Sequence, residues 1–182
     1  MLWQRLNEKS RWNKTDAVID SWLKERQLLL QQFMATTKLP SLQGRTPSPA
    51  IHVVERETLI AFCNTLVDYV SMLHFEILEQ LSMLENQLKS KLGSGYTNRS
   101  SPKQNSPIPF GLNRPLLEKI LKTTNTILDF ELECQNMLKT NKPIATIKDD
   151  LSALGEELAK RMDLEDALIH AYMWARTAMP RI

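Results

Sequence analysis

One long stretch of the chain, residues 55 to 92, constrains the fold more than any other. Its apolar side chains recur at alternating steps of three and four residues, the spacing of a helix packed along a seam: Leu59, Cys63, Leu66, Val70, Leu73, Ile77 and Leu84. A second apolar row lies well round the helix from this seam and contains Val67, Phe75 and Leu78. A helix that is apolar on more than one side is surrounded by neighbours. The stretch therefore predicts the central helix of a bundle.

Three polar residues interrupt the second apolar row. Asp68, Ser71 and His74 follow one another at steps of three residues, which stacks them along one side of a helix. Buried polar groups need hydrogen-bond partners. We therefore expect other helices to supply partners for these three side chains.

The composition of the whole chain indicates an all-α protein. The chain has 182 residues but 5 glycines, and its tracts rich in Leu, Met, Glu, Lys and Gln favour helices over strands. This length suits one domain with one hydrophobic core. We therefore expect a single-domain helical bundle over residues 1–182, with a core of about four long helices and a short N-terminal helix.

Capping residues and apolar periodicity place the other helices. They predict helices over residues 2–12, about 15–36, about 114–139 and from 146 onward. The composition turns to Pro, Ser, Gly and Thr in residues 38–54 and 93–113. We expect both segments to be flexible loops, the second of them basic and without periodicity.

Hydropathy and cysteine usage indicate a cytoplasmic protein. No run of about 18 apolar residues occurs, and the N-terminus is too charged for a signal peptide. Cys63 and Cys134 fall inside predicted helices far apart in the sequence, which suits buried thiols in a reducing cytosol. Neither has a Cys or His partner at metal-ligand spacing, so we expect no disulfide, no metal site and no membrane contact.

The charge balance argues against direct nucleic-acid binding. The net charge of +2 is far from the strongly basic balance of proteins that hold nucleic acid. Acidic residues outnumber basic ones in residues 55–92 and 143–182. A basic partner surface would suit these helices, although an excess of this size is also typical of a solvated face.

Two other helices carry charged residues that could meet the polar row. Trp22 and Arg26 lie one turn apart, and an arginine beside apolar neighbours requires a carboxylate. Arg161 and Glu165 also lie one turn apart, at the edge of an apolar stripe. Their charges suit contact with one another and with Asp68 or Arg26.

The residue types in the polar row do not support catalysis. Asp68, Ser71 and His74 are the types found in a hydrolase triad, but consecutive turns of one helix cannot place a nucleophile beside an oxyanion hole. A di-iron bundle needs Glu-x-x-His motifs, and the residue three before His74 is Ser71. No phosphate-binding or dinucleotide motif is present. We expect a protein that is not an enzyme and that has no cofactor.

Three blocks of sequence together resemble one family of bacterial regulators. They are IDSWLKERQLLL (19–30), FCNTLVDYVSMLHF (62–75) and LGEELAKRMDLEDALI (154–169). The combination is similar to the Rsd/AlgQ family, the regulators of sigma D. The resemblance implies an all-helical anti-sigma factor, a transcription regulator that binds region 4 of the primary sigma factor. Binding there would block contacts of that region with the −35 element and with core polymerase.

The resemblance also suggests which residues form a partner-binding or polar-core network. The matching positions are Trp22, Arg26, Asp68, Tyr69, Ser71, His74, Phe75, Glu156, Arg161, Glu165 and Asp166. We expect some of them to be internal, and Asp68, Tyr69, His74 and Phe75 in particular to reach the partner surface. The alternative is a helical scaffold or adaptor that binds another protein or a small ligand through its polar cavity. The oligomeric state stays open.

Overall fold

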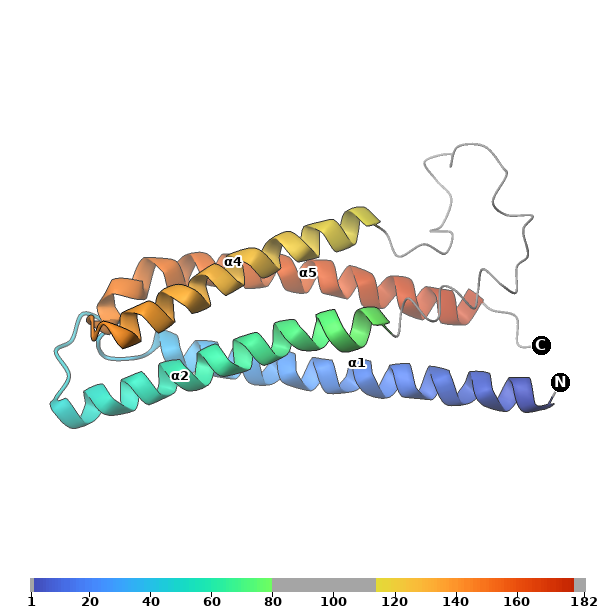
Figure 1. Ribbon diagram of the computed structural model, residues 1–182, viewed down its shortest axis with the longest axis horizontal. Coiled ribbons are helices and arrows are strands. Elements are labelled where there is room, and N and C mark those ends of the chain that lie inside the picture. Colours follow the sequence, from blue (N-terminus) through green and yellow to red (C-terminus); the bar gives the residue numbers. More distant parts are fainter. Residues whose placement is uncertain (1, 80–113, 179–182) are drawn as a thin grey trace.

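Four long helices form a bundle in the part of the chain that the structure describes (Figure 1). The computed structural model describes residues 2–79 and 114–178. The helices are α1 (Leu2–Thr37), α2 (Pro49–Met72), α4 (Arg114–Lys139) and α5 (Lys148–Ala178). Each runs antiparallel to the one before it, with α1 against α2 and α4 against α5. The described residues contain no strand, so the predicted all-α bundle is confirmed.

The predicted short N-terminal helix does not exist as a separate element. Residues 2–37 form one continuous helix, because no proline or glycine interrupts them. Thr15 and Asp16, where a second helix was expected to begin, lie inside α1. The hydroxyl of Tyr172 on α5 donates a hydrogen bond to Asp16 Oδ1 at 2.9 Å. The side chain of Asp16 therefore joins α1 to α5.

The first predicted loop is shorter than expected, because α2 begins at Pro49. Ser48 is the N-cap residue, its Oγ accepting from the Ile51 amide at 3.5 Å, and proline at the first helical position is favourable. The remaining loop is tied to α2: the carboxylate of Glu55 accepts hydrogen bonds from the amide and the hydroxyl of Ser41, at 2.7 and 2.6 Å. Pro49 thus marks a helix start inside a segment that was expected to be a loop throughout.

Two short turns modify the ends of the helices. A π-helical turn (Leu73–Ile77) continues α2, and a 3-10 turn (Ile144–Ile147) precedes α5. Thr146, where the last helix was expected to begin, lies in that turn and donates to the carbonyl of Pro143 at 2.7 Å. The end of the predicted central helix beyond residue 79 and the predicted loop 93–113 lie outside the described residues.

The core follows the predicted seam of α2. All its described members are buried: Leu59, Cys63, Leu66, Val70, Leu73 and Ile77. Aromatic rings from three helices meet at one level, where Phe62 lies 5.9 Å from Phe33 and 6.3 Å from Phe130 between ring centroids. Gly155 lets α5 approach α1, because a Cβ there would lie 2.8 Å from the Phe33 ring. The bundle is therefore centred on the inner side of α2.

The second apolar row of α2 is not enclosed as predicted. Val67 and Leu78 are partly exposed, and 69% of Phe75 is exposed to solvent. Neighbours cover α2 on its inner side, and its outer side forms surface.

The segment Pro49–Ile77 is long and apolar enough to cross a membrane by length and composition alone. Its buried seam lies in the bundle core, as in the core helix of a helical domain.

Candidate functional site

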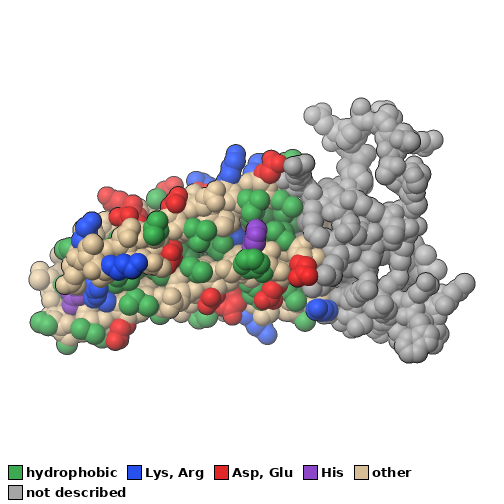
Figure 2. All heavy atoms as spheres, in the orientation of Figure 1, with side chains coloured by type: hydrophobic (Ala, Val, Ile, Leu, Met, Phe, Trp, Pro, Cys, Tyr) green, Lys and Arg blue, Asp and Glu red, His purple; other side chains and the backbone are tan. Residues whose placement is uncertain are grey.

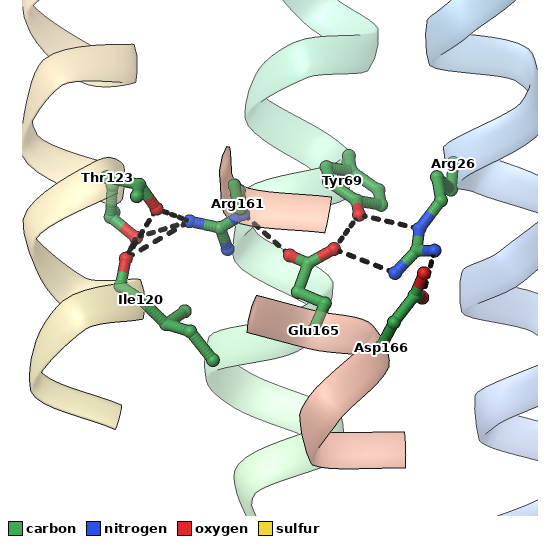
Figure 3. Close-up of polar contacts among 8 residues, drawn as sticks. Arg26, Tyr69, Ile120, Thr123, Arg161, Glu165 and Asp166 are labelled. Atoms are coloured by element: carbon green, nitrogen blue, oxygen red, sulfur yellow. Dashed lines mark hydrogen bonds and ion pairs between the residues drawn. The ribbon is translucent and has the colours of Figure 1, made fainter. Parts of the chain in front are cut away.

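A fully buried arginine anchors the polar network in the middle of the bundle. Arg161 of α5 has no solvent exposure. Its Nε donates to Glu165 Oε1 at 2.7 Å, one turn along the same helix. Its Nη1 donates to α4, to the hydroxyls of Thr123 and Thr124 at 3.0 and 2.8 Å and to the carbonyl of Ile120 at 3.4 Å (Figure 3). Arg161 therefore ties α5 to α4.

The second oxygen of Glu165 connects the network to α1 and α2. The hydroxyl of Tyr69 donates a hydrogen bond to Glu165 Oε2, and Arg26 Nη2 lies 3.2 Å from the same oxygen. Arg26 also pairs with Asp166 and donates from Nε to the Tyr69 hydroxyl at 3.3 Å (Figure 3). Since charge-assisted hydrogen bonds are the stronger ones, this network holds all four helices together at one level.

Aromatic rings enclose the charged groups. The rings of Trp22 and Tyr69 stack with their centroids 6.1 Å apart and 23° between their planes. The guanidinium carbon of Arg26 lies 5.6 Å from the centre of the Trp22 ring, and that of Arg161 lies 5.9 Å from the centre of the Tyr69 ring. These distances suit cation–π attraction, which is stronger where water is excluded.

Burial shifts the ionisation of the two acids in this network. Removal from water raises the pKa of Glu165, although Arg161, the Tyr69 hydroxyl and Arg26 all oppose the shift. Burial likewise raises the pKa of Tyr69, and the negative charge of Glu165 adds to the effect. Tyr69 is therefore a neutral hydrogen-bond donor at physiological pH.

The structure confirms some of the predicted polar contacts and corrects others. Trp22 contacts Arg26, Arg161 pairs with Glu165, and Glu165 pairs with Arg26, as expected. Asp68 and His74 are exposed and Ser71 is partly exposed, so the expectation of a buried polar row is wrong. The expectation that Tyr69 reaches the surface is also wrong, because it is fully buried. Tyr69 lies three residues after Leu66 and four before Leu73, which puts it on the core seam.

An acidic groove lies on the outer side of α2, next to α1. It has a volume of about 370 Å³ and is lined by Glu25, Asp68, Ser71, Met72, Phe75 and Glu76. We call this set the α1–α2 groove. Three of its side chains are carboxylates, and Phe75 is its most exposed apolar residue. It combines negative charge with an apolar anchor, the two properties that a basic protein partner requires.

The π-helical turn shapes one end of the groove. Phe75 and Glu76 lie within the turn Leu73–Ile77, where one wider turn changes the directions of the side chains that follow. The His74 ring lies edge-on to the Phe75 ring, with the centroids 5.1 Å apart. Turns of this kind often occur at functional sites. Its position at an exposed aromatic residue supports a binding role for this end of α2.

Sequence reasoning missed three residues of the groove, Glu25, Met72 and Glu76. Glu25 directly precedes Arg26, and Glu76 lies one turn after Met72. The sequence predicts where each of them lies along its helix. It does not predict that Glu25 of α1 lies near Met72 and Glu76. The predicted site residues Glu156 and Asp166 are exposed on α5, outside the groove.

The centre of the network is closed to solvent in the part of the chain that the structure describes. Trp22, Tyr69, Arg161 and Glu165 are all fully buried and fill the space between the four helices. Arg161 Nη2 and Trp22 Nε1 have no hydrogen-bond partner among the described residues. Within residues 2–79 and 114–178 no group of three or more His, Cys, Asp or Glu side chains could hold a metal ion. The groove is therefore the candidate site for a partner.

Comparison with known proteins identifies the family. A family model described as the regulator of RNA polymerase sigma(70) subunit, Rsd/AlgQ, matches residues 1–173. The chain is 30% identical over 162 residues to a regulator of sigma D from Yersinia pseudotuberculosis, covering 88% of this chain and 80% of the relative. A regulator of sigma D from Sodalis glossinidius is 29% identical over 157 residues, which cover 86% and 88% of the two chains. No solved structure matches. The chain belongs to the Rsd/AlgQ family of regulators of the RNA polymerase sigma(70) subunit.

Proposed function

We propose that this protein is a cytoplasmic, non-enzymatic anti-sigma factor that binds region 4 of the primary sigma factor through the α1–α2 groove. Region 4 contains a helix-turn-helix unit that reads the −35 element, and it also contacts core polymerase. A protein that covers it blocks both contacts. The observation that carries this proposal is the groove itself, in which three carboxylates surround an exposed aromatic residue.

Charge complementarity supports the choice of partner. A surface that binds DNA phosphates is rich in Lys and Arg. Glu25, Asp68 and Glu76 present negative charge to it along one side of the bundle. Attraction between the two surfaces would speed the encounter, and this contribution weakens as salt is added. The same charges disfavour DNA as a direct ligand of the groove.

Apolar contact would set the lifetime of the complex. Exposed aromatic residues at the centre of an interface often carry much of the binding energy. Phe75 is 69% exposed, and Met72 lines the groove beside it. Their burial against region 4 would remove apolar surface from water. We therefore assign Phe75 the role of apolar anchor and Asp68 the role of its charged neighbour.

A binding titration tests the proposal. Isolated region 4 is titrated into the wild-type chain and into Asp68→Ala and Phe75→Ala, with Glu133→Ala as the control. Glu133 is an exposed carboxylate on α4, outside the groove. We expect the affinity to fall at least about tenfold, or about 1.4 kcal/mol, in each groove variant and to stay unchanged in the control.

Two results would count against the proposal. Absence of binding at micromolar protein would exclude region 4 as the partner. Wild-type affinity in both groove variants would leave region 4 as the partner and exclude the groove as its site. A mobility shift on promoter DNA without polymerase would instead support a DNA-binding regulator.

A further inference from the structure

A second surface, along the seam between α1 and α5, contains Glu156 and Asp166, the predicted site residues that lie outside the groove. The ion pair of Arg26 with Asp166 fixes which side of each helix faces the other (Figure 3). Phe33 of α1 and Gly155 of α5 meet further along the same seam. A helix repeats its direction about every 3.6 residues, so residues one or two turns from these contacts also lie along the seam.

Apolar side chains along this seam are exposed to solvent. Four of them are between 38% and 52% exposed: Leu23, Leu30 and Met34 on α1 and Met173 on α5. Leu23 and Leu30 lie one turn on either side of Arg26, and Met173 lies two turns after Asp166. Methionine is unbranched and adapts to the shape of a partner. The described part of the chain therefore leaves an adaptable apolar stripe uncovered here.

The charged side chains along the seam are mostly acidic. Asp163 lies one turn before Asp166 and Glu156 two turns before Asp163, and all three are exposed. Arg26 pairs with Asp166, and its side chain is 13% exposed. His170, one turn after Asp166, is exposed toward one end. We call the following set the α1–α5 face: Leu23, Leu30, Met34, Glu156, Asp163, Asp166 and Met173.

The nearest lysines of the two helices lie on other sides. Lys24 is two residues before Arg26, which turns it about 160° away round α1. Lys160 is six residues before Asp166, about 120° round α5, and pairs with Glu157 at 3.2 Å. By contrast, the side of the bundle in Figure 2 carries Lys and Arg as well as Asp and Glu. The α1–α5 face therefore favours a partner of positive charge.

The dimensions of the face suit a single helix. At a rise of about 1.5 Å per residue, Leu23 to Met34 span about 17 Å and Glu156 to Met173 about 26 Å. These lengths correspond to about three to five turns of a helical ligand. Amphipathic helices bind surfaces of this kind through apolar residues at steps of three, four and seven, and a helix packs readily on a pair of antiparallel helices.

We propose that the α1–α5 face binds a basic amphipathic helix of a partner protein, as a second binding surface beside the α1–α2 groove. Lys and Arg along the edges of such a helix would meet the three carboxylates, and its apolar side chains would cover Leu30 and Met34. The attraction would weaken as salt is added. Glu25 of the groove lies five residues before Leu30, about 140° round the helix, so the two surfaces lie on different sides of α1.

A model peptide tests the face without region 4. The probe is a fluorescent peptide of leucine and lysine, about 18 residues or about 27 Å of helix, with leucine at steps of three and four. Its anisotropy is measured while the full chain is titrated in. We expect Asp163→Lys and Leu30→Lys each to lower the affinity at least about tenfold, and a peptide with glutamate in place of lysine not to bind.

Matched controls lie on α4. Asp129→Lys changes an exposed aspartate, and Leu121→Lys changes a leucine that is 42% exposed, as Leu30 is. Both should keep the wild-type affinity, as should Phe75→Ala in the groove, and all variants should retain the helical circular dichroism of the wild type. Three results overturn the proposal: no binding of the lysine peptide at about 100 μM chain, an equal loss of affinity in the α4 controls, or an equal loss in Phe75→Ala, which would place the peptide in the groove.

Discussion

Asp68 and Tyr69 are consecutive residues of α2, but they belong to two different regions of the molecule. Tyr69 is fully buried and donates to Glu165 in the network that joins four helices. Asp68 is exposed and lines the α1–α2 groove. One step along a helix turns the side chain by about 100°, which is enough to exchange core for surface. The buried network and the proposed partner site therefore lie on different sides of one helix, and we expect stability and binding to change separately.

The largest effect on stability is expected from the centre of the buried network. Arg161→Ala removes the buried cation that donates to Glu165 Oε1 and to the hydroxyls of Thr123 and Thr124. We expect it to lower the free energy of unfolding by about 3 to 5 kcal/mol, the usual cost of breaking a buried ion pair. Urea unfolding followed by circular dichroism measures this.

A double variant serves as the control for Arg161→Ala. Arg161→Met with Glu165→Leu removes both charges and keeps the volume filled, so it should lose less stability than Arg161→Ala alone. An equal or larger loss in the double variant would show that packing, and not the unpaired charge, causes the effect.

Tyr69→Phe should have an intermediate effect on stability. It removes the hydroxyl that donates to Glu165 and accepts from Arg26, and it leaves the ring stacked on Trp22. We expect a loss of about 2 kcal/mol, since hydrogen bonds to charged groups contribute about 1.5 to 3 kcal/mol. Region 4 affinity should stay near that of the wild type in the folded variant. A large loss of affinity without loss of stability would contradict the division between the two sides of α2.

The buried carboxyl of Glu165 should make stability depend on pH. Burial raises its pKa in the folded state above the ordinary value of 4.5. Between the unfolded and folded pKa the folded state binds more protons, so the free energy of unfolding should fall as pH rises through this window. Urea unfolding from about pH 4 to about pH 8 measures the slope, and Glu165→Gln should flatten it. A wild-type stability that rises across the window would show that the two arginines depress this pKa instead.

The smallest effect on stability is expected in the groove. Phe75→Ala and Asp68→Ala remove exposed side chains, so the free energy of unfolding should change by no more than about 0.5 kcal/mol. Their effect should appear in region 4 binding, and for Asp68→Ala it should diminish as salt screens the charge. Loss of stability in Asp68→Ala comparable to that in Tyr69→Phe would erase the distinction between the two residues.

Local sequence patterns predicted the helices of this fold better than they predicted which residues of different helices meet. The seam of α2 is buried as its three-and-four spacing indicates, and Arg161 pairs with Glu165 across one helical turn. The groove was only partly foreseen. Asp68 and Phe75 were expected to contact a partner, but Glu25 was not, because it reaches them from another helix.

The sequence by itself determined that the chain is helical, where most helices run, and which residues share a side of each helix. These properties depend on contacts within about four residues and on the period of the helix. The tertiary structure decided which side of each helix is covered by the other helices. The contact of Arg26 with Glu165 joins residues 139 positions apart. Asp68 is exposed because no other described helix covers its side of α2. Contacts at such separation depend on how whole helices pack, and no local spacing specifies that.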